Sequence, residues 1–137
     1  MVRFAAAAAS IVLLAASPPP GGSPPPGLAA AAACTVAPGA QVALRSSELD
    51  PDVFVWDSRE RVLDYAAGYW RDTKDVVAHS LLAKPGTRAT VVRCYESAVS
   101  SRYVNARQDL LAVRIVSGPN RGRYGWITSE DVSPASR

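Results

Sequence analysis

The chain has 137 residues with a formal net charge of +3, and 48% of its residues are hydrophobic. The first 33 residues hold 12 alanines and 6 of the 11 prolines, so only the remaining 104 residues have a composition able to build a core. A segment of that length supports one small domain, which excludes a multidomain enzyme. It carries 14 basic and 12 acidic residues, a balance too even to indicate a particular partner.

Residues 1–33 are predicted to be a signal peptide followed by a Pro/Ala-rich leader or linker. Arg3 precedes a largely apolar run of 13 residues, which is typical of a secretory signal and too short for a membrane span. Residues 17–27 contain only Ser, Pro and Gly, a composition that cannot pack. We therefore expect the domain, residues 34–137, to be secreted or to reside in the periplasm or cell envelope.

Cys34 and Cys94, the two cysteines of the chain, leave three alternatives open. In an exported chain they favour one disulfide that closes a long loop. The alanine-rich stretch before Cys34 also distantly resembles a lipoprotein attachment signal, so membrane association is expected only if Cys34 is lipidated. Two free buried thiols are the third alternative.

The first strand is predicted at residues 41–45, a short alternating segment that follows Pro38 and Gly39. Residues 46–81 have a different pattern and are predicted to be a variable, partly helical insertion. Within this insertion, residues 52–56 fit a strand as well as any other structure.

Two short helices are predicted inside this insertion. Asp57 and Glu60 have the spacing of a capping box, and apolar residues then recur at helical intervals up to Gly68, a typical residue at a helix C-terminus. Asp72 is the expected cap of a second helical segment over residues 72–80.

The remaining elements are strands. A turn at residues 82–87 leads into a β-branched, alternating strand at residues 88–95. Residues 110–116 and 123–127 flank a Gly- and Pro-containing reversal, which predicts an antiparallel hairpin. A short turn then leads to a last strand at Val132.

This order of elements resembles the small barrel of bacterial SH3-like domains. The resemblance rests on Leu82, Gly86 and Thr87 before the alternating valines, and on residues 113–127, a hairpin that ends in Gly-Trp and an aliphatic residue. With residues 41–45 it covers about half of the chain. It implies a mainly β fold, a small barrel of about five antiparallel strands, with the partly helical insertion in the first long loop.

The resemblance also implies a non-catalytic module that recognises a peptide, cell-wall or protein partner through loops and aromatic side chains. The insertion lies where the binding loop of the family would be, so an accessory or inhibitory protein acting through residues 57–80 is the alternative. The aromatic candidates for ligand binding are Trp126, Tyr124, Tyr103 and Trp70.

Catalysis, metals and cofactors receive no support from the sequence. The single histidine, His79, lies among apolar neighbours without a convergent nucleophile, and two cysteines 60 positions apart do not have the spacing of a metal site. Residues 80–137 hold 9 basic and 4 acidic residues, which makes nucleic acid a third and lesser candidate. Export argues against that candidate, so no nucleic acid partner is expected.

Overall fold

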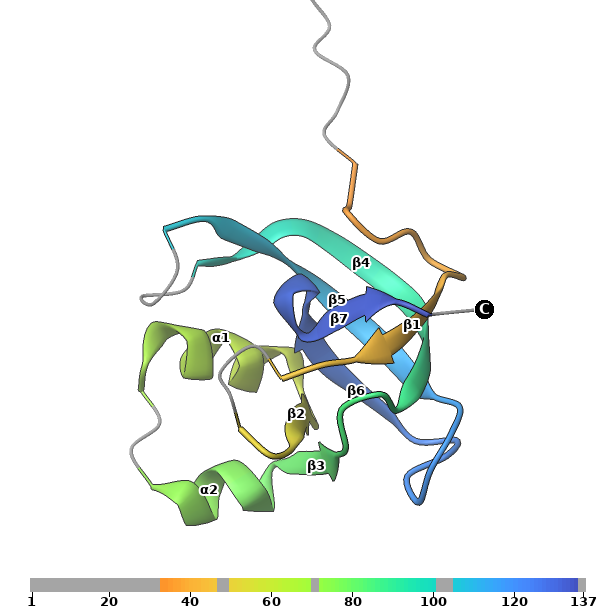
Figure 1. Cartoon of the computed structure of the whole chain (residues 1–137). Helices are drawn as coiled ribbons and strands as arrows, with labels where there is room; N and C mark the ends of the chain where they lie inside the picture. Colours follow the sequence, from red (N-terminus) through yellow and green to blue (C-terminus); the bar gives the residue numbers. More distant parts are fainter. Residues whose placement is uncertain (1–32, 47–49, 70–71, 101–104, 136–137) are drawn as a thin grey trace, which may run out of the picture. The chain divides into compact units, whose positions relative to one another are not determined.

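The computed structural model describes residues 33–46, 50–69, 72–100 and 105–135 (Figure 1). Residues 1–32 of the predicted leader, Trp70 and Tyr103 therefore lie outside the described residues. The described elements, in chain order, are β1 (Gln41–Leu44), β2 (Val53–Trp56), α1 (Arg59–Ala67), α2 (Thr73–Ala78), β3 (Ser80–Ala83), β4 (Arg88–Ser100), β5 (Arg107–Ile115), β6 (Tyr124–Thr128), the 3₁₀ turn η1 (Ser129–Asp131) and β7 (Val132–Pro134).

The strands form one antiparallel sheet in the order β3-β2-β6-β5-β4-β1-β7, which curls on itself (Figure 1). The expectation of a mainly β fold is confirmed, but the number of about five strands is wrong, because the described residues form seven. The two additional strands are β2 and β3. β2 lies in the segment predicted as a partly helical insertion, where residues 52–56 fit a strand as well as any other structure, and β3 begins at the end of that segment and includes Leu82 and Ala83, which were predicted as part of a turn. They pair with each other over four residues, and Trp56 of β2 pairs with Trp126 of β6.

The hairpin of β5 and β6 confirms the predicted reversal. Gly118 and Gly122 have φ values of +74° and +89°, which glycine adopts without the steric cost of a side chain. The N–H of Gly122 donates to the carbonyl of Ile115 at 2.8 Å and closes the turn. β4 is longer than predicted, because it continues beyond Tyr95 to Ser100. Its pairing with β5 shifts register twice, between Val91 and Arg93 and between Tyr95 and Val99.

The predicted capping box of α1 is wrong. The N-cap is Ser58, without a side-chain cap hydrogen bond, whereas Gly68 ends the helix in the left-handed conformation as predicted. The Asp57 carboxylate instead lies 3.1 Å from Arg61 and 3.1 Å from His79, and these two partners draw it away from the helix N-terminus. The cap of α2 is confirmed, since the Asp72 carboxylate accepts a hydrogen bond from the N–H of Lys74 at 2.9 Å.

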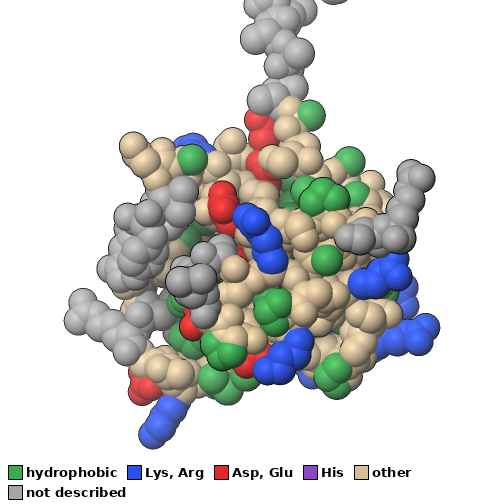
Figure 2. Space-filling model, viewed as in Figure 1, with side chains coloured by type: hydrophobic (Ala, Val, Ile, Leu, Met, Phe, Trp, Pro, Cys, Tyr) green, Lys and Arg blue, Asp and Glu red, His purple; other side chains and the backbone are tan. Residues whose placement is uncertain are grey.

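Two hydrophobic clusters hold the domain together. Alternation sends one side of each strand into the curl of the sheet and the other side outward. The inner cluster contains Val42, Leu44, Val53, Val55, Ala83, Ala89, Val91, Leu111, Val113, Ile115, Ile127 and Val132. The outer cluster joins the sheet to the helices and contains Trp56, Val62, Ala66, Val76, Val99 and Leu110. On the face drawn in Figure 2, the described hydrophobic side chains lie in small groups between charged ones.

Gly125 on β6 allows β2 and β6 to approach closely. A Cβ at this position would lie 2.9 Å from the carbonyl oxygen of Trp56 and would also meet the Val55 side chain. We expect Gly125→Ala to lower the free energy of unfolding by about 1–3 kcal/mol, because neither neighbour moves without disturbing β2. Urea denaturation measures this loss. In a Val55→Ala background the loss should shrink, and an unchanged midpoint for Gly125→Ala alone would show that the close approach is incorrect.

Candidate functional site

The outward side of β4, β5 and β6 carries large aromatic and basic side chains. The pairing places Arg93 opposite Ala112 and Ala112 opposite Trp126, so these residues form one row across three strands. Arg114 and Tyr124 face each other in the next row. We call the surface made by Arg93, Tyr95, Arg114, Tyr124 and Trp126 the outer face.

Helix α1 covers one end of this part of the sheet. It packs against Trp56, which is only 3% exposed, and its Tyr65 ring lies 5.0 Å from the Trp56 ring, centroid to centroid. Trp126 is half-buried at the edge of the same cluster, with its ring 6.0 Å from that of Tyr95. The helix therefore fixes the orientation of the aromatic side chains at this end of the outer face.

The other end of the outer face, at Tyr124, is open to solvent, and this side chain is 63% exposed. Tyr95 lies at the end near α1 and is 37% exposed. The Arg59 guanidinium from α1 lies 5.8 Å from the centroid of the Tyr95 ring, within the range of a cation–π contact. The outer face thus presents flat aromatic surface next to hydrogen-bond donors of positive charge, which together suit recognition more than covalent chemistry.

Trp126 and Tyr124, two of the predicted ligand-binding residues, lie on β6 two positions apart and so point to the same side of the sheet. The other two predicted ligand-binding residues, Tyr103 and Trp70, lie outside the described residues. Sequence reasoning missed Tyr95 and Arg93 as members of this surface. The alternation of residues along β4 could have indicated which side chains point outward. However, the register shift after Val91 reverses the side of the sheet that each later residue of β4 faces.

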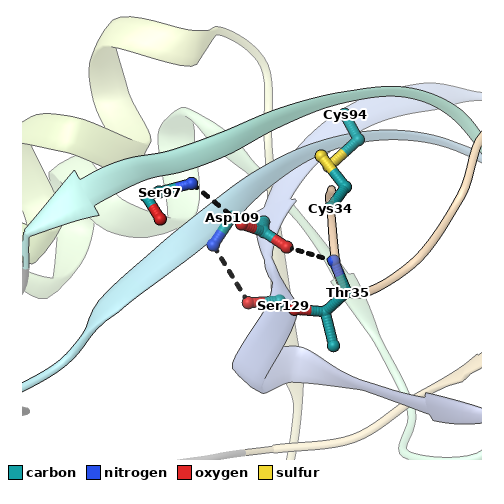
Figure 3. The surroundings of a disulfide bond; sticks show 6 residues. All are labelled: Cys34, Thr35, Cys94, Ser97, Asp109 and Ser129. Carbon is teal, nitrogen blue, oxygen red and sulfur yellow. Dashed lines mark hydrogen bonds between the residues drawn. A yellow bond between two sulfur atoms is a disulfide. The ribbon is translucent and has the colours of Figure 1, made fainter. Parts of the chain in front are cut away.

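Cys34 and Cys94 form a disulfide, with their Cα atoms 6.3 Å apart (Figure 3). This confirms the first of the three alternatives for the cysteines, since a bonded sulfur is neither free nor acylated. The bond attaches the segment before β1 to the middle of β4. It also suggests an oxidising, extracellular compartment. Neither helix in the described part of the chain has the length and apolar character that a membrane crossing requires.

Asp109 lies beside the disulfide and is only 5% exposed. Its carboxylate accepts hydrogen bonds from the N–H of Thr35 at 2.6 Å and from the N–H of Ser97 at 2.8 Å, while its own N–H donates to the Ser129 hydroxyl (Figure 3). Ser97 lies in the bulge of β4 between Tyr95 and Val99 and has a φ of +48°, which is unusual for a residue other than glycine. In this conformation its N–H donates to the Asp109 carboxylate. Asp109 therefore joins three separate segments of chain.

Burial alone would raise the pKa of the Asp109 carboxyl. The hydrogen bonds from Ser97 and Thr35 outweigh burial and hold this pKa below its ordinary value of 3.8. The carboxylate and the two sulfurs lie within 4.8 Å of one another. In the disulfide, however, neither sulfur is a thiolate, which is the form that binds metals.

The fold and these contacts define a small, disulfide-bonded β domain with an aromatic and basic outer face. Comparison with protein-family models, with curated proteins and with solved structures finds no match for the chain.

Proposed function

We propose that this chain is an exported, non-catalytic SH3-like module that binds a peptide, cell-wall or protein partner through its outer face. The order of elements supports the barrel: β1 is followed by a long excursion, two consecutive hairpins from β4 to β6, a 3₁₀ turn, and β7, which returns to pair with β1. The disulfide supports export.

The observation that carries the proposal is the exposure of Tyr124 beside Trp126. Burying a tyrosine that is 63% exposed would remove apolar area from water while its hydroxyl remains able to form hydrogen bonds. Trp126 is held by the outer cluster, so it loses little conformational freedom when a ligand covers it. Tryptophan and tyrosine are among the residues most enriched at binding hot spots.

We expect Tyr124→Ala to weaken binding to purified bacterial cell-wall sacculi at least tenfold, a loss of about 1.4 kcal/mol. Co-sedimentation over a range of protein concentrations measures the affinity. Tyr69→Ala is the matched control, because Tyr69 is 76% exposed but follows α1 and belongs to none of the three strands of the outer face. Circular dichroism of both variants checks that the fold is retained.

The same assay distinguishes the alternative in which residues 57–80 are the recognition element. Val77 lies on α2 and is 48% exposed, so Val77→Ser changes the surface of that segment without removing a buried side chain. If Val77→Ser weakens binding and Tyr124→Ala does not, the alternative is favoured and the proposed role of the outer face is wrong.

A further inference from the structure

We infer that the outer face binds an extended peptide segment whose carboxylates occupy alternate positions. The inference rests on the proposed function, because it names the chemical class of ligand for the same surface. It comes from the spacing of three arginines that the sheet places on its outward side: Arg88, Arg93 and Arg114.

The three arginines form a zigzag across β4 and β5, in which Arg114 of β5 lies between the levels of Arg88 and Arg93 on β4. Arg93 pairs with Ala112, so Arg114, two residues further along β5, is its diagonal neighbour. The carbonyl of Arg88 accepts a hydrogen bond from the N–H of Val116 at 2.8 Å, which places Arg88 diagonally from Arg114 on the other side. Diagonal neighbours across an antiparallel pair are about 7–8 Å apart.

These arginines are exposed, and among the described residues none of them has an ion-pair partner. The outward positions of β4, β5 and β6 near them hold Thr90, Ala112, Tyr124 and Trp126, none of which is acidic. Three neighbouring positive charges repel one another. A negatively charged ligand would remove this repulsion.

The spacing of the three arginines matches the side-chain repeat of an extended peptide. In an extended chain every second side chain points the same way, with a repeat of about 6.6–6.8 Å. Carboxylates at alternate positions could therefore each meet one guanidinium, which binds a carboxylate through two parallel hydrogen bonds. Trp126 and Tyr124 have the same repeat on β6, so they would lie along one side of the bound segment.

The test uses the full chain with its disulfide formed and two fluorescein-labelled peptides of one composition. One peptide has the sequence Glu-Val-Glu-Val-Glu and the other Glu-Glu-Glu-Val-Val. We expect fluorescence anisotropy at about 50 mM salt to show at least tenfold tighter binding of the alternating peptide, and this difference should decrease as salt is added. Equal affinities for the two peptides, or no binding of either, would overturn the inference.

Two double variants test the role of the arginines. Arg93→Ala with Arg114→Ala should weaken binding of the alternating peptide at least tenfold. Arg121→Ala with Arg123→Ala removes the same charge from the β5–β6 turn and its edge, outside the zigzag of Arg88, Arg114 and Arg93, and should change binding less than threefold. Equal losses in both double variants would show that net charge alone is responsible and would overturn the inference.

Further measurements separate this inference from simpler explanations. A single-stranded oligonucleotide of similar charge that binds as tightly as the alternating peptide would overturn the peptide assignment. If Tyr124→Ala weakens binding to sacculi while Arg93→Ala with Arg114→Ala does not, and neither peptide binds, the inference fails and the proposed function stands.

Thermal unfolding of the Arg93→Ala, Arg114→Ala double variant should occur at the same or a higher temperature than that of the wild-type chain, because no ion pair is lost.

Discussion

Replacing both bridging cysteines, Cys34→Ser with Cys94→Ser, is expected to lower the free energy of unfolding by about 4 kcal/mol. The two residues are 60 positions apart, and closing a loop of this length removes that much conformational freedom from the unfolded chain in the loop-entropy model. A domain of this size has a total stability of only about 5–15 kcal/mol, so a loss of 4 kcal/mol is a large fraction.

Urea denaturation without reductant measures this loss. A matched control is available in the same two proteins: reductant should destabilise the wild-type chain and leave the double variant unchanged. The urea dependence should also be steeper for the variant, because its unfolded chain exposes more surface. Equal midpoints for the two proteins without reductant would show that the bond adds nothing to stability.

The second large effect is expected at Asp109. Asp109→Asn should lower the free energy of unfolding by about 2–3 kcal/mol at pH 7, since an amide group carries no charge and has one acceptor oxygen for the N–H groups of Thr35 and Ser97. Glu96→Gln is the control, because Glu96 is an exposed carboxylate on β4, the strand that pairs with β5, which carries Asp109. Glu96→Gln should lower the free energy of unfolding by no more than about 0.5 kcal/mol.

The loss at Asp109 should also depend on pH in a defined direction. The pKa of this carboxyl is lower in the folded state than its ordinary value of 3.8, so its contribution is complete above about pH 4 and disappears as the pH falls through the folded value. The stabilities of the wild-type chain and Asp109→Asn should therefore converge under strong acid. A difference that stays constant from pH 7 down to pH 2 would contradict the assigned hydrogen bonds.

Local sequence patterns predicted the elements whose signals lie within a few residues. Glycines and β-branched residues indicated the β5–β6 hairpin and the first part of β4, and Gly68 marked the end of α1. Each of these depends on backbone preferences or on neighbours in the sequence. The disulfide was favoured for a similar reason, since it followed from two cysteines and a leader typical of export.

The elements that were missed or left undecided depend on distant partners. β2 and β3 are stabilised by pairing Trp56 with Ser80 across 24 positions and by a contact with β6, and neither strand carries that information within its four residues. Prediction of the candidate site was limited in the same way by contacts between residues that are distant in the sequence. Tyr124 and Trp126 could be chosen as aromatic residues, but their alignment with Arg93 and Arg114 follows from the register of three strands and a bulge.

The disulfide also determines how the domain transmits mechanical force. A pull on the chain before residue 34 passes through the sulfur bridge directly to Cys94 and bypasses the segment between the two cysteines. That segment would add about 200 Å if it were drawn out, and the bridge prevents this extension. β1 lies inside the protected loop, whereas its partner β7 lies outside it. Tension across the domain would therefore peel β7 away first, one hydrogen bond at a time, while β1 remains held against β4.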